Sequence, residues 1–485
     1  MWHFRKDLAA TQKREDYIMK RKLINCFMAV VMAATLFSGC GSQGKTADSS
    51  GKSADSTEKS EDTSGSDSGE AEAEAVTTVG PDSGTHMEMW AFVEMHNTFY
   101  AKMLEKWNEE NPDRQIQITF TTYPFADMHN KMIMALQTGE GAPDLCDIER
   151  GQFPNFLQGE VQLYPLNDAL EQYEDDLVPS RIEIYSKDGK NYGAPTHVGA
   201  TVMFYNDEIL KKYDIDYTKI KTWDDYTKAA EQLKEASGGK VKMTSVDTGG
   251  TDWLWLAMAE NKEDWVKKNG KAFIPDAIPQ MLKMQQGWLD DDLAMVSPDG
   301  QVDLEAGFQN ILDGNIASFP KAMWYMSRFL NYMPEEKGKW AMAPCPVFEE
   351  GQPRSVGIGG TGTVVTKQSE DPKLAADFIT YAKCSKEGCI GIWENLGFDV
   401  CNTSVWADPE ITQDTSNQYI AFFKTNPFDV LNEIKDEVEA ITVNENTFTL
   451  GDYLNTTTLN AILQDGSKID DEIKDAKDYM EVEQD

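Results

Sequence analysis

Basic residues are scarce in this sequence of 485 residues. It holds 45 Lys and Arg against 82 Asp and Glu, so its formal net charge is −37 at pH 7. Such a negative surface repels phosphate backbones, which excludes nucleic acid as a partner. Histidine is also rare: five are present, and no two lie within one helical turn. We therefore expect no metal site built from neighbouring histidines, and no cofactor.

Motifs of nucleotide-binding proteins and of serine hydrolases are missing. The glycine-rich stretch 357–362 lacks the lysine of a phosphate-binding P-loop and precedes a predicted strand instead of a helix. We expect these glycines to let two backbone segments approach closely. No Gly-x-Ser-x-Gly motif occurs. The three aspartates at 290–292 are interpreted as a solvated loop and not as a calcium site.

The apolar run near the N-terminus is too short to cross a membrane comfortably. Residues 23–37 are uncharged and mostly apolar, and they follow Lys-Arg-Lys at 20–22. The run ends in Phe-Ser-Gly before Cys40, which resembles the lipobox of bacterial lipoproteins. The resemblance implies that Cys40 becomes the new N-terminus and carries lipid; a secretory signal with an incidental cysteine is the alternative. We interpret residues 1–39 as an upstream extension plus a signal peptide.

Aromatic residues are absent from the segment between Cys40 and residue 85. Ser, Gly, Thr, Ala and acidic residues dominate it, with ten Asp and Glu against three Lys. Such a segment cannot bury enough apolar surface to offset the entropy lost on ordering. We therefore predict a disordered stalk over residues 40–85, between the lipid anchor and the folded part.

Cysteine pairs with metal-binding spacing are also missing. Five cysteines remain once Cys26 and Cys40 are assigned to the signal and the anchor, and no Cys-x-x-Cys occurs among them. Cys389 and Cys401 could form a disulfide, but buried thiols are the favoured interpretation. The five are Cys146, Cys345, Cys384, Cys389 and Cys401.

From residue 86 onward, strand and helix patterns alternate. Alternating polarity predicts strands at 87–92, 115–120 and 144–148, with helical spacing at 99–107 and 128–137 between them. This order implies parallel strands joined by crossover helices, which is an α/β fold. Later segments continue the pattern, with predicted strands at 200–205, 314–319 and 362–366 and predicted helices at 207–212, 222–235, 373–382 and from 452 onward.

Several motifs resemble those of the extracellular solute-binding proteins of carbohydrate ABC importers. The most specific one runs from Phe204-Tyr205-Asn206-Asp207 to Thr222-Trp223-Asp224-Asp225. Residues 141–144, 314–317 with Trp324, and 371–379 with 385–388 add to it. A narrower resemblance, to the arabino-oligosaccharide-binding lipoproteins of Gram-positive bacteria, rests on residues 195–203, 324–329, 359–365 and 396–399.

The resemblance implies a two-lobed α/β fold of the periplasmic-binding-protein type II, with the ligand cleft between the lobes. The first lobe would be residues 86–196 plus 350–400, and the second 200–340 plus 408–485. The function implied is that of a monomeric, non-enzymatic receptor, anchored through Cys40 on the extracellular face of the cytoplasmic membrane. It would deliver an oligosaccharide, with an arabino-oligosaccharide favoured, to the permease subunits of an ABC importer.

Sugar sites combine aromatic faces, which cover ring C–H groups, with planar polar side chains, which bind hydroxyls. In open α/β sheets these side chains gather at the carboxyl ends of strands. Trp324 is the strongest candidate, because a polar segment follows it and the family resemblance places a stacking aromatic there. The candidates are Phe92, Glu94, His96, Glu149, Arg150, Gln152, His197, Asp252, Trp253, Trp255, Trp324, Tyr325, Trp393 and Asp399.

Several of these candidates have a purely structural alternative. Glu149 and Arg150 can pair with each other at the surface, and His197 can be a core histidine. Trp393 can be a helix-packing residue. Trp253 and Trp255 lie 200° apart on a helix, so only one of them is expected to face the cleft.

Two other functions fit an exported, acidic chain. A glycoside hydrolase needs two carboxylates that lie ~5–5.5 Å apart for retention or ~6.5–9.5 Å apart for inversion, and no motif marks such a pair. A surface carbohydrate-binding adhesin without a transporter would carry the same anchor and stalk. Neighbouring genes for two permease subunits would distinguish the receptor from the adhesin.

Overall fold

The computed structural model describes residues 75–484. The described residues all belong to one compact unit. The predicted signal peptide, Cys40 and most of the predicted stalk lie outside the described residues. Within residues 75–484, no helix is both long enough and apolar enough to span a membrane.

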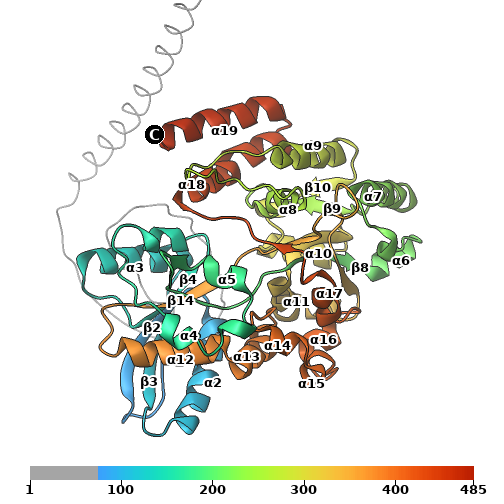
Figure 1. Cartoon of the computed structure of the whole chain (residues 1–485). Coiled ribbons are helices and arrows are strands. Elements are labelled where there is room, and N and C mark those ends of the chain that lie inside the picture. The colour runs from blue at the N-terminus through green and yellow to red at the C-terminus, as the bar shows by residue number, and fades with distance from the viewer. Residues whose placement is uncertain (1–74, 485) are drawn as a thin grey trace, which may run out of the picture. The chain divides into compact units, whose positions relative to one another are not determined.

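The first sheet has six strands and contains the early part of the chain (Figure 1). Its strands are β1 (Ala75–Val79), β2 (Thr85–Ala91), β3 (Ile116–Thr122), β4 (Leu145–Glu149), β7 (Ala194–Pro195) and β14 (Thr361–Val365). They follow the order β1-β3-β2-β4-β14-β7. The pairs β2–β3 and β2–β4 are parallel, as the strand–helix alternation predicts. β14 is antiparallel to β4 and brings a late segment of the chain back into this sheet.

Alternation along these strands sends neighbouring side chains to two different cores. Met89 of β2 belongs to the core that includes α2 (Glu94–Glu110). Trp90, the next residue, belongs to a separate core with Met132 of α3 (Phe125–Thr138). Period-two alternation therefore gives this sheet an apolar core on each of its two faces.

The strand β1 corrects the predicted boundary of the stalk. Its sequence Ala-Val-Thr-Thr-Val pairs antiparallel with β3, from Ala75 opposite Thr122 to Val79 opposite Ile118. The fold therefore begins before residue 86, and residues 75–79 are ordered. The low-complexity composition of the surrounding segment concealed a short run of β-branched residues, which favour extended backbone and pair with the outer edge of β3.

The second sheet has three antiparallel strands. β8 (Thr201–Asn206) lies between β11 (Ser318–Ala322) and β12 (Trp340–Ala343). Phe204 and Phe319 stack between the first two strands, with ring centres 5.6 Å apart. The strand predicted at 314–319 is displaced toward the C-terminus, because the chain first turns at Gly314, whose φ is 68°.

The most specific family-like motif consists of helix starts. Asn206 Oδ1 accepts a hydrogen bond from Ile209 N at the start of α6 (Asp207–Lys212). At the start of α7 (Trp223–Ser237), Thr222 Oγ1 accepts from Asp225 N, and the Asp225 carboxylate accepts from Thr222 N, each at 3.2 Å. These caps satisfy backbone N–H groups that the helix itself leaves unpaired.

Chain segments that run between the two sheets lie against one another. Two isolated β-bridges join them, His197 with Val400 and Ala200 with Gly357. The predicted lobe boundaries, 86–196 plus 350–400 and 200–340 plus 408–485, remain predictions. The bridges bring the segments 197–200, 357–360 and 398–400 together near the ends of both sheets, and we call this region the junction.

Glycine is required at this junction. Gly199 has a φ of 73°, and a Cβ atom on it would lie 2.2 Å from Ile358 O. Gly359 and Gly360 have φ values of 71° and 126°. Residues with a Cβ atom rarely adopt such φ values. The close backbone approach predicted for 357–362 is seen between Gly199 and Ile358, whereas the glycines of the run leave room mainly for side chains, such as those of Arg181 and Tyr185.

We call the part built on the six-stranded sheet the first half and the part built on the three-stranded sheet the second half. The remaining elements complete both halves. The helices are α4 (Asn167–Leu170), α5 (Pro179–Glu183), α8 (Asp252–Glu260), α9 (Ala277–Asp290), α10 (Glu305–Leu312), α11 (Met326–Tyr332), α12 (Pro372–Cys384), α13 (Lys386–Leu396), α14 (Thr403–Trp406), α15 (Pro409–Thr412), α16 (Gln418–Phe422), α17 (Pro427–Ile434), α18 (Glu445–Tyr453) and α19 (Ile469–Glu483). The short strands are β5 (Ser186–Lys187), β6 (Lys190–Asn191), β9 (Thr244–Val246), β10 (Ala294–Val296), β13 (Ser355–Val356) and β15 (Val438–Glu439).

All five cysteines of the described part are buried and free, so the buried-thiol interpretation is confirmed and the disulfide between Cys389 and Cys401 is absent.

Candidate ligand-binding site

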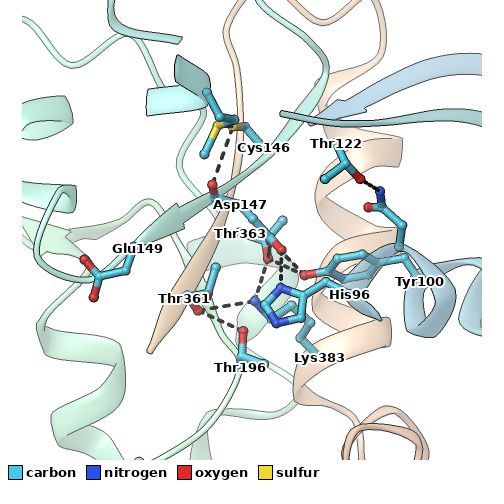
Figure 2. A network of polar contacts seen from close by, with 12 residues as sticks. His96, Tyr100, Thr122, Cys146, Asp147, Glu149, Thr196, Thr361, Thr363 and Lys383 are labelled. Atoms are coloured by element: carbon cyan, nitrogen blue, oxygen red, sulfur yellow. Dashed lines mark hydrogen bonds and ion pairs between the residues drawn. The ribbon is translucent and has the colours of Figure 1, made fainter. Parts of the chain in front are cut away.

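His96 lies in the first turn of α2, shortly after the carboxyl end of β2. Its Nδ1 is 3.0 Å from Oδ2 of Asp147, a fully buried residue of β4 (Figure 2). The ring of the partly buried Phe92 lies 6.2 Å from the His96 ring, and its other neighbour Phe125 is 43% exposed. This end of the sheet therefore presents aromatic surface beside an imidazole that a buried carboxylate orients.

Glu149 and Arg150, at the end of β4, point to different partners. The Glu149 carboxylate accepts a hydrogen bond from Gly151 N at 2.6 Å, and burial raises its pKa. Arg150 is 2% exposed and donates from Nη1 to Gly357 O at 2.8 Å and from Nη2 to Ile441 O. The two side chains do not form an ion pair, so the interpretation as a surface pair is wrong.

Arg150 also reaches a tryptophan of α8, the helix that follows β9 in the chain. Its guanidinium carbon lies 4.7 Å from the ring centre of Trp255 in α8. The Nε atom of Arg150 and the Nε1 atom of Trp255 are buried and have no hydrogen-bond partner in the described part of the chain. A cation–π contact with two unused N–H donors beside it suits a polar ligand that brings acceptors.

Trp324 lies on the other side of the glycine-rich junction. Its Nε1 donates to Ile358 O at 3.3 Å, and a Cβ atom on Gly359 would lie 3.2 Å from that nitrogen. The guanidinium carbon of Arg328 is 5.4 Å from the Trp324 ring, and Asp303 holds Arg328 at 2.9 Å. The indole is thus fixed at its edge while part of its surface stays exposed.

His197 and Asp399 lie side by side at the junction. Both nitrogens of the buried His197 ring and the Oδ1 atom of Asp399 have no partner among the described residues. Asp399 Oδ2 accepts from Ala200 N at 2.7 Å, and burial raises the pKa of this carboxyl to about 6. The His197 ring packs on Phe398 with ring centres 4.8 Å apart. Buried polar atoms without partners carry a free-energy cost, which a hydroxyl-rich ligand or ordered water would remove.

Arg181 of α5 joins this group, although no sequence pattern marks it. It is 3% exposed, and its guanidinium makes no hydrogen bond or ion pair within residues 75–484. A Cβ atom on Gly357 would lie 1.5 Å from its Nη2, so only glycine leaves room for it. Its charge lowers the pKa of Arg150, of His197 and of Asp399, although burial is the largest influence on each.

The junction thus gathers aromatic faces and planar polar groups, which is the chemistry of a carbohydrate site. A sequence profile described as "Bacterial extracellular solute-binding protein" matches residues 93–384. The chain belongs to this family. The family and the two-lobed type II fold that we predicted are therefore confirmed.

Curated relatives of this solute-binding protein extend over most of its length. The arabinooligosaccharide-binding protein of Halalkalibacterium halodurans is 39% identical over 417 residues, which cover 84% of this chain and 92% of that protein. The arabinooligosaccharide-binding protein of Bacillus subtilis is 36% identical over 402 residues, which cover 82% and 92%.

Solved structures agree with the fold of this solute-binding protein. The sugar-binding protein MalE of Xanthomonas citri has a TM-score of 0.68 at 16% identity, over 82% of this chain and 96% of that one. A binding protein of Bifidobacterium animalis subsp. lactis, solved with β-1,6-galactobiose, has a TM-score of 0.64 at 23% identity, over 82% and 98%. Identities this low support the fold alone.

In this solute-binding fold, eight of the predicted site residues converge on the junction. Seven of them contact another member of the group, the segment 357–360 or a neighbouring ring or strand that they share, and Glu149 directly precedes Arg150 in the chain. They are Phe92, His96, Glu149, Arg150, His197, Trp255, Trp324 and Asp399.

Three predicted aromatics lie in hydrophobic cores instead, which corrects their assignment as ligand contacts. Trp253 is 3% exposed and packs on Trp223 and Trp288. Tyr325 is fully buried and donates its hydroxyl to Val302 O. Trp393 is 2% exposed and packs on Phe428, with ring centres 4.6 Å apart.

Three polar candidates lie outside the converging group. Glu94 is exposed on the first turn of α2. Gln152 accepts a 3.4 Å hydrogen bond from Asn155 in the next turn. Asp252 forms a 2.5 Å ion pair with the buried Lys321, which Asp247 also contacts at 3.7 Å. Asp252 therefore neutralises a buried lysine next to the helix that carries Trp255.

Proposed function

We propose that this solute-binding protein is the receptor that captures an arabino-oligosaccharide outside the cell and delivers it to an ABC importer. The observation that carries the proposal is the identity of 39% and 36% to two arabinooligosaccharide-binding proteins, each matched over 92% of its own length. The relatives and neighbours described above are binding proteins, so they favour neither the glycoside hydrolase nor the free adhesin.

The converging residues supply what an uncharged oligosaccharide needs. Trp324, Trp255 and Phe92 offer faces for sugar C–H groups, because each is only partly buried. Arg150 and Arg181 donate hydrogen bonds, and Asp399 and Glu149 accept them. A sugar hydroxyl both donates and accepts, so it can bridge an unpaired guanidinium and an unpaired carboxylate oxygen.

The function requires no bond to be made or broken. Phe92, His96 and Arg150 belong to the half built on the first sheet, whereas Trp255 and Trp324 follow strands of the second half. A ligand that contacts both groups stabilises the arrangement in which they face each other, and a permease can recognise that arrangement. The ATPase of the importer then supplies the energy for transport.

The location follows from the N-terminal sequence. We propose that the protein is a monomer held on the extracellular face of the cytoplasmic membrane by lipid on Cys40. Cys40→Ala should move the protein from the membrane fraction to the medium. An unchanged membrane fraction would remove the proposed anchor without affecting the proposed ligand.

Isothermal titration calorimetry of a soluble protein without residues 1–40 tests the ligand. Arabino-oligosaccharides of two to six units are titrated beside maltose-type, xylo-, galacto- and cello-oligosaccharides. We expect micromolar or tighter binding, about −8 kcal/mol or better, for the arabinose series, with the sugar unchanged afterwards. Binding confined to another series would overturn the arabinose assignment, and shortened products would favour the hydrolase.

A further inference from the structure

An unbroken chain of hydrogen bonds runs from the interior of the first half to His96 (Figure 2). Lys383 Nζ lies 2.5 Å from Thr363 Oγ1, which lies 2.6 Å from Asp147 Oδ1; Asp147 Oδ2 meets His96 Nδ1 at 3.0 Å. Lys383, Thr363 and Asp147 are each 0% exposed. The consecutive elements β14 and α12 therefore meet the much earlier strand β4 behind one imidazole.

The lysine sets the direction of the first hydrogen bond in this chain. A protonated lysine only donates, so Thr363 Oγ1 accepts from Lys383, and its own hydrogen is left for Asp147 Oδ1 at 2.6 Å or for the Tyr100 hydroxyl at 2.9 Å. Burial lowers the pKa of Lys383 to about 8, with the charge of Asp147 acting against it, so the amine is protonated at pH 7. Tyr100 donates to Asp147 as well, at 2.7 Å.

Asp147 is ionised in this setting. Burial raises the pKa of its carboxyl, but the hydrogen bond from His96 and the charge of Lys383 outweigh burial, and the pKa is lower than usual. A carboxylate only accepts, so the proton between the two residues belongs to His96 Nδ1. Nε2 makes no hydrogen bond to any residue within 75–484.

Apolar rings flank His96. The rings of Phe92 and Phe398 lie 6.2 and 6.0 Å from the imidazole and solvate a charge poorly. A neutral ring with its proton on Nδ1 presents a lone pair at Nε2.

We propose that Lys383, Thr363 and Asp147 are positioning residues that hold His96 as a hydrogen-bond acceptor, so that the site selects a ligand with a hydroxyl that donates to Nε2. The inference rests on the proposed function, which places His96 against the sugar. It assigns a role in specificity to Lys383 and Thr363, neither of which belongs to the converging group.

Substitutions at Thr363 test the chain of hydrogen bonds. Thr363→Val has nearly the same shape but lacks the hydroxyl, whereas Thr363→Ser keeps it. We expect Thr363→Val to weaken binding of the preferred oligosaccharide about tenfold and Thr363→Ser to bind within about twofold of wild type, since one hydrogen bond to a charged group is lost in the first and kept in the second. Thr380→Val is the matched control, because Thr380 is equally buried and donates only within α12.

Long-range ¹H–¹⁵N correlation spectra of histidine-labelled protein give a second readout that needs no ligand. We expect His96 to show a protonated Nδ1 and an unprotonated Nε2 at pH 7, and Thr363→Val to disturb this pattern where Thr380→Val does not. An imidazolium, a proton on Nε2, or equal affinities of Thr363→Val and Thr363→Ser would each overturn the proposal. If wild type binds no oligosaccharide of the panel, the proposed function fails, while the spectrum still tests the positioning of His96.

Discussion

The guanidinium of Arg150 packs on the ring of Trp255, with 4.7 Å between its carbon and the ring centre. Arg150 follows a strand of the first sheet, and Trp255 lies in a helix that packs with the second half. The same guanidinium holds the backbone at Gly357 and Ile441. One side chain therefore joins both halves and two of the segments between them.

Trp255→Leu should loosen this link. A desolvated cation–π contact contributes about 2 kcal/mol, so its loss favours separation of the two halves. Small-angle X-ray scattering should give a larger radius of gyration for the ligand-free variant than for the wild type. Trp107→Leu is the control, because Trp107 stacks on Arg114 at 5.4 Å within the first half only. Equal radii for Trp255→Leu and wild type would contradict the link.

Trp324→Ala should weaken oligosaccharide binding without unfolding the protein. Loss of a stacking face removes roughly 2 kcal/mol of apolar contact with the sugar, which is about thirtyfold in affinity. Calorimetry measures the affinity, and thermal unfolding checks the fold. Tyr332→Ala should leave affinity unchanged, since Tyr332 stacks on Phe308 away from the converging residues and is 56% exposed.

Arg181→Met should lower the affinity for the oligosaccharide but raise the stability of the protein. The side chain of Arg181 is buried, and its charge disfavours the charge of Arg150, so its removal relieves about 1 kcal/mol or more of desolvation and repulsion and raises the melting temperature. Affinity should fall about tenfold, because ligand hydroxyls lose a charged donor. Arg354→Met should lower the melting temperature and leave the affinity unchanged, since Arg354 is paired with Glu433 and Glu437 at 2.7 and 2.6 Å. A variant of Arg181 that is less stable and binds normally would rule out the role in binding.

Glu260 should make the protein less stable as the pH rises. Burial raises its pKa to about 8, although Trp223 Nε1 donates to the carboxyl at 3.1 Å. The folded state thus prefers the protonated form, and the cost of ionising Glu260 grows from about pH 4.5, where the unfolded chain ionises, to about pH 8. Glu260→Gln removes this cost, so its melting temperature relative to wild type should increase between pH 5 and pH 8.

A similar glutamate provides the control for that pH series. Glu336 is 3% exposed and accepts from Trp340 Nε1 at 2.8 Å, but it also has Lys339 as an ion-pair partner at 2.8 Å. Glu336→Gln removes a paired charge and should lower the melting temperature at pH 8. If the difference in melting temperature between Glu260→Gln and wild type does not change with pH, the assignment of the titration to Glu260 is wrong.

Polarity patterns predicted the part of the site that follows regular strands. Phe92, His96, Glu149 and Arg150 were selected because β2 and β4 alternate clearly and side chains after parallel strands meet at one edge, and their contact with a ligand stays a prediction. Trp253 and Tyr325 were misassigned, because sequence alone does not show which face of a helix turns toward the cleft. Arg181 carried no signal, since only its proximity to Gly357 across the fold makes it part of the site.

The strand β1 was missed because the composition was averaged over a long segment. The five β-branched and small residues of β1 lie at the end of an acidic, serine-rich stretch, and their pairing with β3 depends on a strand that comes later in the sequence. Conversely, the helices at 207–212 and 222–235 were predicted correctly, because the start of a helix depends on residues only about three positions apart.

β1 is an edge strand of the six-stranded sheet, and this determines where the chain can be shortened. β3 uses one edge for β2 and the other for β1, and Thr78 and Thr119 join their hydroxyls across the latter at 3.0 Å. A protein cut at residue 85 would leave the outer N–H and C=O groups of β3 without a neighbour. Such a bare edge recruits strands from other molecules, so this truncation should aggregate, whereas one that keeps Ala75–Val79 should stay dispersed.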